Sequence, residues 1–315
     1  MRVLLTGGAG FLGGHCLQRF LRAGHEVVVV DTCDDQPTPR AQKLATLAAA
    51  TALGPVSHLA LDVRARDAIV DAVGRADIVV HLAALPAVMP SMARPLDYAA
   101  VNVAGTAAML EAALRLGARR VVLASSSSVY GEMPGAQRED DPAIAPESPY
   151  GASKRAGELL AHAWSRGAGI GVTALRFFTV YGPGQRPDMA VHTFMRQVAA
   201  GEPVHARADA GRDFVHATDA ARAVELAALR TTPGLEIFNV GSGVTTPLAT
   251  LVEMIGRALG RAPILGADLA PWAGDVAHTH ADPERAAREL GFRATIDLAQ
   301  GLASAWAWQR QLLGL

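Results

Sequence analysis

A glycine-rich turn close to the N-terminus constrains the fold of this chain more than any other feature. An apolar stretch at residues 2–6 leads into Gly7, Gly10 and Gly13, and a helical pattern follows as far as Gly24. Glycines at this spacing, between a strand and a helix, let the backbone approach a pyrophosphate closely. The N-terminus of the helix adds positive potential. The pattern therefore predicts a dinucleotide-binding unit.

An acidic residue after the second predicted strand indicates which dinucleotide binds. Residues 26–30 predict a strand that ends in Asp31, 18 residues beyond Gly13. A carboxylate at this position accepts hydrogen bonds from the adenosine ribose and repels a 2′-phosphate. We therefore expect NAD rather than NADP as the cofactor.

Strands and helices continue to alternate through residues 1–177. This order predicts a parallel sheet with helices on both faces, which binds its ligand beyond the carboxyl ends of the strands. We expect an α/β fold, with a Rossmann-type doubly wound parallel sheet that binds NAD in residues 1–177. Further strands are predicted at residues 58–61, 77–82, 121–124 and 172–177, helices at 65–73 and 96–116, and a loop with a short alanine-rich helix at 37–55.

The pattern becomes less regular after residue 177. Residues 179–189 contain two prolines and two glycines, which predict a shaped loop. We expect residues 178–315 to form a smaller C-terminal α/β region that binds the substrate and packs with the first part around one cleft. Its predicted helices are residues 192–200, 219–229, 248–259 and 298–313, and its predicted strands are 212–216 and 236–240.

A tyrosine and a lysine stand one turn apart on a predicted helix. Ser148 suits the N-cap and Pro149 the first turn, so Tyr150 and Lys154 share one helical face. A lysine cation beside a phenol stabilises the phenolate and lowers the pKa of the tyrosine. Such a phenol exchanges protons with an alcohol or a ketone. A serine at the carboxyl end of the preceding strand, Ser126, is placed to stabilise the same oxygen.

The composition argues against several other classes of function. The net charge is −1 and 19% of residues are charged, without the clustered positive charge that nucleic acid or an anionic membrane surface requires. We therefore expect neither as a partner, and a cytoplasmic location without a signal peptide or membrane span. We expect no metal, because Cys16 and Cys33 lack ligand spacing and His278 and His280 lack a third ligand.

Short motifs distributed over nearly the whole chain carry a resemblance to a known family. They are residues 6–13, 62–63, 81–84, 102–106, 125–131, 150–154, 212–214 and 239–241. Together they resemble the extended short-chain dehydrogenase/reductase family, specifically its NAD-dependent sugar-nucleotide epimerases and dehydratases, and most closely the UDP-glucuronate 4-epimerases. The resemblance implies a UDP-sugar substrate, and a homodimer formed through the helices at 96–116 and 150–164.

The resemblance also implies roles for individual residues. Ser126, Tyr150 and Lys154 are the implied catalytic residues. Asn102 has two interpretations, either as an asparagine satisfied within the core or as a group that orients the site behind Tyr150. The implied NAD-binding residues are Gly7, Gly10, Phe11, Leu12, Gly13, Asp31, Asp62, Val63, Leu82, Ala83, Ala84, Asn102, Tyr150 and Lys154.

Two positions after Ser126 discriminate among the reactions of the family. In its 4,6-dehydratases, and in UDP-glucuronate decarboxylases at the second position, the matching residues are acidic and serve as acid and base. Here they are Ser127 and Ser128. A hydroxyl group with a pKa far above neutrality does not replace a carboxylate as a proton shuttle. We therefore expect C4 epimerisation through a transient 4-keto intermediate.

The predicted loop closely resembles that of the UDP-glucuronate 4-epimerases. Hydroxyl groups and a guanidinium suit a sugar carboxylate, so Ser127, Ser128, Thr179 and Arg186 are the expected partners. For Arg186, a phosphate contact or an exposed charge is the alternative interpretation.

The resemblance also implies a separate pair of residues that bind the nucleotide of the substrate. It assigns Arg212 to the diphosphate and Asp275 to a ribose. Many relatives carry Arg or Gln three residues before that aspartate, followed by Pro, whereas this chain has Trp272 and Ala273. The nucleotide base is therefore less defined than the sugar chemistry, and dTDP-sugars are not excluded.

Conversion of UDP-glucuronate to UDP-galacturonate is the favoured prediction, with three alternatives. A UDP-glucose/galactose 4-epimerase would share the mechanism, and a dTDP- or UDP-sugar 4-ketoreductase would show net NADH consumption. A sensor or scaffold that binds the dinucleotide without turnover is disfavoured, because family members of that kind usually lack the pair formed here by Tyr150 and Lys154.

Overall fold

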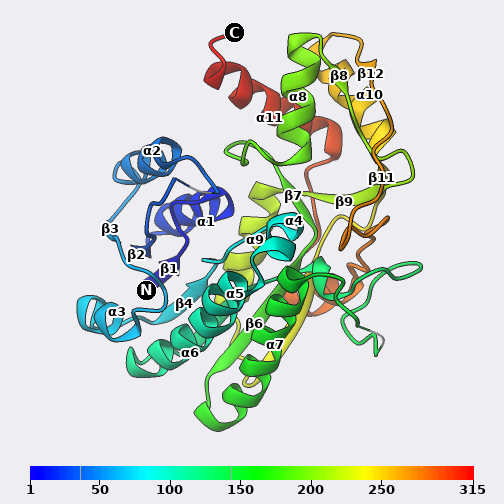
Figure 1. Cartoon of the computed structure of the whole chain (residues 1–315). Helices are drawn as coiled ribbons and strands as arrows, with labels where there is room; N and C mark the ends of the chain where they lie inside the picture. Colours follow the sequence, from blue (N-terminus) through cyan, green and yellow to red (C-terminus); the bar gives the residue numbers. More distant parts are fainter. Residues whose placement is uncertain (36, 143) are drawn as a thin grey trace.

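The computed structural model describes residues 1–35, 37–142 and 144–315. Its central feature is a seven-stranded parallel sheet with the order β10-β6-β5-β4-β1-β2-β3 (Figure 1). The direction of winding reverses between β1 and β4, as in doubly wound dinucleotide-binding folds. The predicted fold class is therefore confirmed. The strands are β1 (Arg2–Thr6), β2 (Glu26–Val30), β3 (Val56–Leu59), β4 (Ile78–His81), β5 (Arg120–Ser126), β6 (Gly171–Phe177) and β10 (Leu235–Val240).

Alternate side chains of each strand pack against two different layers of helices. Val3 and Leu5 belong to the core under α1, α2 and α9, whereas Leu4 and Val28 belong to the core under α3, α6 and α7. All four side chains are buried, as expected for parallel strands covered on both faces. These helices are α1 (Phe11–Arg22), α2 (Arg40–Ala50), α3 (Arg66–Val73), α6 (Gly105–Arg115), α7 (Pro149–Ala168) and α9 (Ala217–Ala228).

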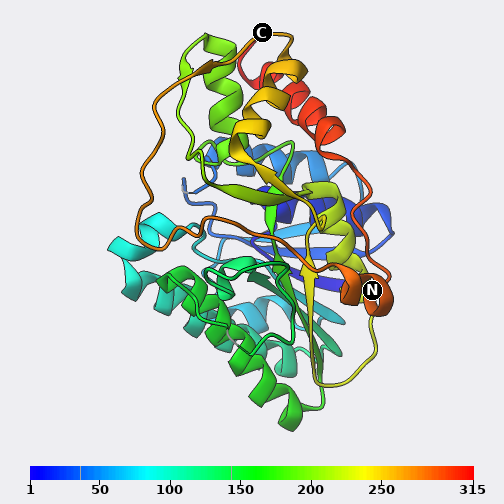
Figure 2. The same cartoon turned by 90° about the vertical axis from the view of Figure 1, so that its right-hand side faces the viewer.

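A smaller part of the molecule lies beside the central sheet and contains its own core. Figure 2 shows it at the upper end of the molecule, with the central sheet below. Met195, Leu251 and Leu302 are fully buried at its centre. Its sheets have the orders β11-β9-β7 and β12-β8. Its elements are β7 (Thr179–Tyr181), α8 (Ala190–Ala200), β8 (Pro203–Val204), β9 (Gly211–His216), β11 (Thr245–Pro247), α10 (Leu248–Leu259), β12 (Ile264–Leu265) and α11 (Leu298–Leu312).

The chain returns to the central sheet after residue 177. Strand β10 pairs with β6 along its full length, and α9 packs against α1. Residues 178–315 therefore contribute an edge strand and a covering helix to the first part as well as the whole smaller part. Within the described ranges, no helix is long and apolar enough to cross a bilayer.

The loop predicted at residues 179–189 is partly wrong. Thr179–Tyr181 forms β7, which pairs in parallel with residues 214–216 of β9. These three residues are β-branched or aromatic, which favours a strand, and they precede the first glycine of the segment, Gly182. The irregular segment is therefore residues 182–189, which we call the cleft loop.

The helix predicted at residues 96–116 consists of three segments. A short α5 (Pro95–Tyr98) and α6 flank a π-helical segment, η1 (Ala99–Ala104). Such π-helical turns are rare and occur frequently at functional sites. Asn102 lies in this segment and is buried.

Candidate active site

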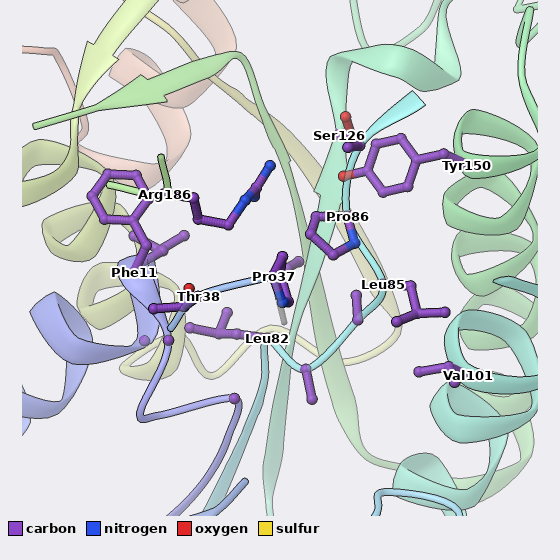
Figure 3. Close-up of a pocket in the computed structure, with 18 of the residues that line it drawn as sticks. Phe11, Pro37, Thr38, Leu82, Leu85, Pro86, Val101, Ser126, Tyr150 and Arg186 are labelled. Carbon is purple, nitrogen blue, oxygen red and sulfur yellow. The ribbon is translucent and has the colours of Figure 1, made fainter. Parts of the chain in front are cut away.

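A cleft of about 690 Å³ opens where the parallel strands end. Gly7 follows β1, Asp31 follows β2, Leu82 follows β4 and Ser126 ends β5, so four strands direct residues into one space. Figure 3 shows the cleft with Phe11 and Arg186 on one side and Ser126 and Tyr150 on the other. The predicted site residues that line it are Gly7, Gly10, Phe11, Leu12, Gly13, Asp31, Asp62, Val63, Leu82, Ala83, Ala84, Ser126, Ser127, Ser128, Tyr150, Lys154, Thr179 and Arg186.

The glycine turn has the close packing that its spacing predicts. Gly7 has a φ of +71°, and a Cβ atom there would lie 2.8 Å from the backbone nitrogen of Ala83. A Cβ atom on Gly13 would lie 1.9 Å from the carbonyl oxygen of Gly7. Larger residues would therefore separate β1 from β4 or push α1 away from the turn. The turn forms a backbone cradle at the N-terminus of α1 that suits a pyrophosphate.

The carboxylate of Asp31 is held by three donors. It accepts hydrogen bonds from the backbone nitrogens of Ala9 at 3.2 Å and Cys33 at 2.9 Å. The ammonium of Lys43, on α2, lies 3.4 Å from it, and both side chains are buried and line the cleft. A carboxylate fixed in this way keeps lone pairs for a ribose diol.

Lys43 is not among the residues predicted for the site, although one feature of the sequence marks it. The chain contains two lysines, Lys43 and Lys154, whereas its other basic residues are arginines. Both lysines line the cleft. The alanine-rich pattern around Lys43 predicts a helix but does not indicate which face is buried, so only the rarity of lysine marks this position.

Tyr150 and Lys154 are positioned by the start of helix α7. The Ser148 hydroxyl accepts a hydrogen bond from the backbone nitrogen of Gly151 at 3.1 Å, and Pro149 occupies the first turn, as predicted. The Lys154 ammonium lies 5.9 Å from the centroid of the Tyr150 ring and donates to the carbonyl oxygen of Ala124 at 2.9 Å. The helix therefore presents both groups to the end of β5.

The pKa of Tyr150 shifts in the direction opposite to the one predicted. Burial raises the pKa of the phenol, and this effect outweighs the lowering by a hydrogen bond from Ser126 and by the charge of Arg186. Burial also lowers the pKa of Lys154 to about 8. Desolvation depends on the tertiary packing around the helix, so the spacing of the two residues did not reveal it.

Ser126 is oriented by the turn that follows it. Its hydroxyl oxygen accepts a hydrogen bond from the backbone nitrogen of Ser128 at 3.1 Å and thereby caps a 3₁₀ turn, η2 (Ser127–Val129). The hydroxyl proton is left for another acceptor. Figure 3 shows Ser126 beside the hydroxyl end of the Tyr150 side chain, so the two hydroxyl groups can serve one substrate oxygen.

Asn102 lies behind the wall of the cleft rather than in its lining. Its side-chain oxygen accepts from the backbone nitrogen of Leu85 at 2.8 Å. Its side-chain nitrogen donates to the carbonyl oxygen of Leu85 at 3.0 Å and to the Ser153 hydroxyl at 2.9 Å. Leu85 lines the cleft and Ser153 lies on α7, so this asparagine is satisfied within the core and also connects the cleft wall to the helix of Tyr150.

Arg186 carries positive charge into the cleft from the cleft loop. Its guanidinium forms two hydrogen bonds with the Asp188 carboxylate, at 2.9 and 3.0 Å. Arg186 is largely buried, whereas Asp188 is half exposed. The side chain extends across the cleft from the side of Phe11 toward Ser126 and Tyr150 (Figure 3).

The two residues predicted to bind the nucleotide meet in the smaller part, outside the lining of this cleft. Arg212 and Asp275 form an ion pair at 2.7 Å, as do Arg207 and Asp275 at 3.1 Å. Arg207 is not among the predicted residues, because the family pattern marks a different position, Trp272, which is exposed here. Arg207 also pairs with Asp209 at 2.6 Å, so two guanidiniums and two carboxylates converge at this end of the molecule.

Comparisons with known proteins agree with this arrangement. Residues 3–241 match the model of the "NAD dependent epimerase/dehydratase family". The chain is 32% identical to a probable UDP-glucuronate 4-epimerase of Rhizobium meliloti, over 99% of this chain and 97% of that one. It is 30% identical, with a TM-score of 0.91, to UDP-glucuronic acid 4-epimerase from Bacillus cereus in complex with UDP-glucuronic acid and NAD, over 99% and 100% of the chains. It is 38% identical, with a TM-score of 0.87, to MoeE5 in complex with UDP-glucuronic acid and NAD, with the same coverage.

Proposed function

The chain belongs to the NAD dependent epimerase/dehydratase family, and from this premise we propose that it converts UDP-glucuronate to UDP-galacturonate by epimerisation at C4 through a transient 4-keto intermediate. One observation carries the proposal. Ser126, Ser127, Ser128 and Tyr150 line a single cleft together with Arg186, and Figure 3 shows Ser126, Tyr150 and Arg186 around it. A proton-exchanging pair thus lies beside groups that suit a sugar carboxylate.

The residues of the cleft fit NAD as the cofactor. Gly7 and Gly13 leave a cradle that side chains would fill, and Asp31, whose carboxylate is held by backbone donors, is the proposed contact for the adenosine ribose. NAD, when bound, supplies a reversible hydride acceptor for C4 of the sugar. The protein's own residues bind and orient the substrate and move the proton.

Tyr150 takes the proton from the 4-hydroxyl group and later returns it. Because burial raises the pKa of the phenol, its ionised form needs nearby positive charge and hydrogen-bond donors. Lys154 supplies the charge from one turn along α7. Ser126 donates to the developing carbonyl oxygen, since its own oxygen already accepts from the backbone of Ser128.

Serines at the two positions that follow Ser126 favour epimerisation over elimination. Ser127 and Ser128 line the cleft immediately after Ser126, at the two positions where elimination would need carboxylates. Serine hydroxyl groups do not replace carboxylates as proton shuttles near neutral pH, but they can bind a carboxylate in more than one orientation. This suits a keto-sugar that turns over about its diphosphate link and presents its other face. Thr179 and Arg186 complete the proposed carboxylate site.

We assign the cofactor and the substrate to different parts of the chain. Residues 1–177 bind NAD and carry Ser126, Tyr150 and Lys154, and residues 178–315 bind the nucleotide sugar. Arg212 and Asp275 are proposed contacts for the diphosphate and ribose, and their ion pair supports a common role at that end of the molecule.

We also propose that the protein is a cytoplasmic homodimer. The proposed interface is formed by α7 and the helical segments at residues 96–116. Apolar side chains are exposed there or nearby, on α4 (Val88–Ala93), α5, α6 and α7, and would be covered by a partner. These are Met89, Met92, Leu96, Leu114, Leu159 and Leu160. Cys16 and Cys33 are free thiols, in keeping with a reducing compartment.

The proposal is tested by incubating the protein with UDP-glucuronate and NAD and resolving the products by NMR. We expect UDP-galacturonate to form without a net change in NADH absorbance. Failure to form it from this substrate rejects the proposed function. Turnover of UDP-glucose instead identifies the alternative 4-epimerase, and net NADH consumption with a keto-sugar identifies a reductase.

A further inference from the structure

Two helices on the NAD side of the cleft contact the backbone of the cleft loop. On α1, the Nε2 atom of His15 lies 2.8 Å from the carbonyl oxygen of Pro183. On α2, the Nε2 atom of Gln42 donates to the carbonyl oxygen of Gly184 at 2.6 Å. A carbonyl oxygen only accepts, so Nε2 of His15 carries the hydrogen. Consecutive carbonyl groups of the loop are thus held by side chains from two different helices.

Further restraints on the loop come from α8, where the Thr193 hydroxyl donates to the carbonyl oxygen of Pro187 at 3.1 Å, and from the buried side chain of Gln185. Gly182 and Gly184 have φ values of +140° and +83°, in the region that favours glycine. A Cβ atom on Gly184 would lie 3.7 Å from Gln42 and 3.8 Å from the Phe11 ring, so the loop rests directly against the start of α1. Its own hydrogen bonds are local, from the backbone nitrogen of Gln185 to Gly182 and from that of Met189 to Arg186.

The contacted residues, Pro183 and Gly184, lie three and two residues before Arg186, which carries positive charge into the cleft. The orientation of the Arg186 side chain is completed by Asp188. The charge of Arg186 also acts on Tyr150, where it lowers the pKa of the phenol. The position of the loop backbone therefore affects both the binding of a carboxylate and the ionisation of the proton shuttle.

We infer that His15 and Gln42 are positioning residues that fix the cleft loop and thereby set the selectivity for an acidic sugar. The helices that carry them also form the NAD site, because α1 starts at the glycine turn and α2 carries Lys43 beside Asp31. The part of the protein that binds the dinucleotide thus determines where the substrate carboxylate is bound. The inferred selectivity for an acidic sugar rests on the proposed function, whereas the inferred restraint of the cleft loop rests only on the contacts of His15 and Gln42.

The test uses the NAD-loaded full-length protein with His15→Phe and Gln42→Met, singly and together. Phenylalanine keeps the ring packed edge-on against Phe11, and methionine keeps the length of glutamine, so each change removes the donor with little loss of volume. Gln18→Met, on the same helix as His15, is the matched control, because the Gln18 side chain bonds only to Arg22 among the described residues.

Titration calorimetry with UDP-glucuronate and UDP-glucose gives the first measurement. In the double variant we expect the Kd for UDP-glucuronate to rise about tenfold, which corresponds to the loss of one to two hydrogen bonds. The Kd for UDP-glucose, the NAD content and the melting temperature should stay at the values of the control. Equal weakening of both sugars would assign the two side chains a purely structural role and overturn the inference.

Hydrogen exchange of the loop amides gives a measurement that does not depend on the substrate. The amides of Gln185 and Met189 should exchange faster in the double variant than in the wild type and in Gln18→Met. Unchanged exchange at both amides rejects the inference. If the wild-type protein fails to convert UDP-glucuronate, the proposed function fails, and the exchange rates still decide whether His15 and Gln42 restrain the loop.

Discussion

The Lys154 ammonium donates to the carbonyl oxygen of Ala124 at 2.9 Å and so ties helix α7 to the carboxyl end of β5. A second tie lies one turn further along the helix, where the Ser125 hydroxyl donates to the Glu158 carboxylate at 2.6 Å. The two contacts fix the height and rotation of α7 relative to the strand. They therefore place Tyr150, one turn before Lys154, opposite Ser126.

Replacing Tyr150 by phenylalanine should abolish most of the activity without affecting the fold. The ring stays packed, but the proton shuttle is lost, and general acid–base groups typically contribute about 10²- to 10⁴-fold to rate. We expect kcat to fall by at least about 10³-fold, with NAD content and melting temperature unchanged. Residual activity within about tenfold of the wild type would assign the proton transfer to another group.

Lys154 should titrate far below an ordinary lysine. Burial lowers its pKa to about 8 from 10.5. Between these values the unfolded state binds a proton that the folded state has lost, so the free energy of unfolding rises with pH through this window. Relative to Lys154→Met, the wild type should gain about 2 kcal/mol between pH 7 and 10.

The titration can be observed directly because the chain has two lysines. NMR spectra of protein labelled with ¹³C-lysine should contain two ε-carbon signals, and Lys43→Arg assigns them. If the Lys154 signal titrates with a midpoint near pH 10 instead of pH 8, burial does not lower the pKa of this lysine.

Glu158 should be a large contributor to stability. Its two carboxylate oxygens pair with the guanidinium of Arg176, each at 2.9 Å, and both side chains are 1% exposed. Glu158→Gln leaves the arginine buried without a counter-charge, which should cost about 3 to 5 kcal/mol in urea unfolding. Glu253→Gln, in an exposed pair with Arg257, is the control and should cost less than about 1 kcal/mol. Similar losses in both variants would contradict the argument from burial.

The local geometry of the site was predictable from the sequence because short spacings encode it. The glycine turn places Gly7 against β4, and Asp31 ends β2, because both depend on the strand–turn–helix order. The cap at Ser148 likewise sets the face that carries Tyr150 and Lys154. These features require contacts within one or two neighbouring elements.

Features that depend on distant packing were not predictable. Lys43 meets Asp31, and His15 and Gln42 meet the cleft loop, only after α1 and α2 have packed beside it. The raised pKa of Tyr150 has the same origin, since desolvation is a property of the assembled cleft. The strand at β7 escaped prediction because its partner, β9, lies more than 30 residues away along the chain.

Arg186→Ala should weaken the binding of an acidic sugar selectively. A charge-assisted hydrogen bond contributes about 1.5 to 3 kcal/mol, so KM for UDP-glucuronate should rise about 10- to 100-fold. KM for UDP-glucose should change less than about threefold, because its C6 hydroxyl carries no charge to lose. Arg196→Ala, an exposed residue on α8, is the control. Equal effects on the two sugars would place Arg186 at a phosphate instead, the alternative interpretation of this residue.

Lys43→Met should weaken the retention of NAD. The Lys43 ammonium is buried beside the Asp31 carboxylate, and the described part of the chain provides it with that single hydrogen-bond acceptor, so two of its three N–H groups remain for the cofactor. Methionine fills the same volume but leaves Asp31 without its counter-charge. We expect the Kd for NAD, measured by titration of the cofactor-free protein, to rise about tenfold or more. Lys43→Arg retains the charge and should recover part of the loss. An unchanged Kd in Lys43→Met would mean that neither the N–H groups of the lysine nor its charge beside Asp31 contributes to the binding of NAD.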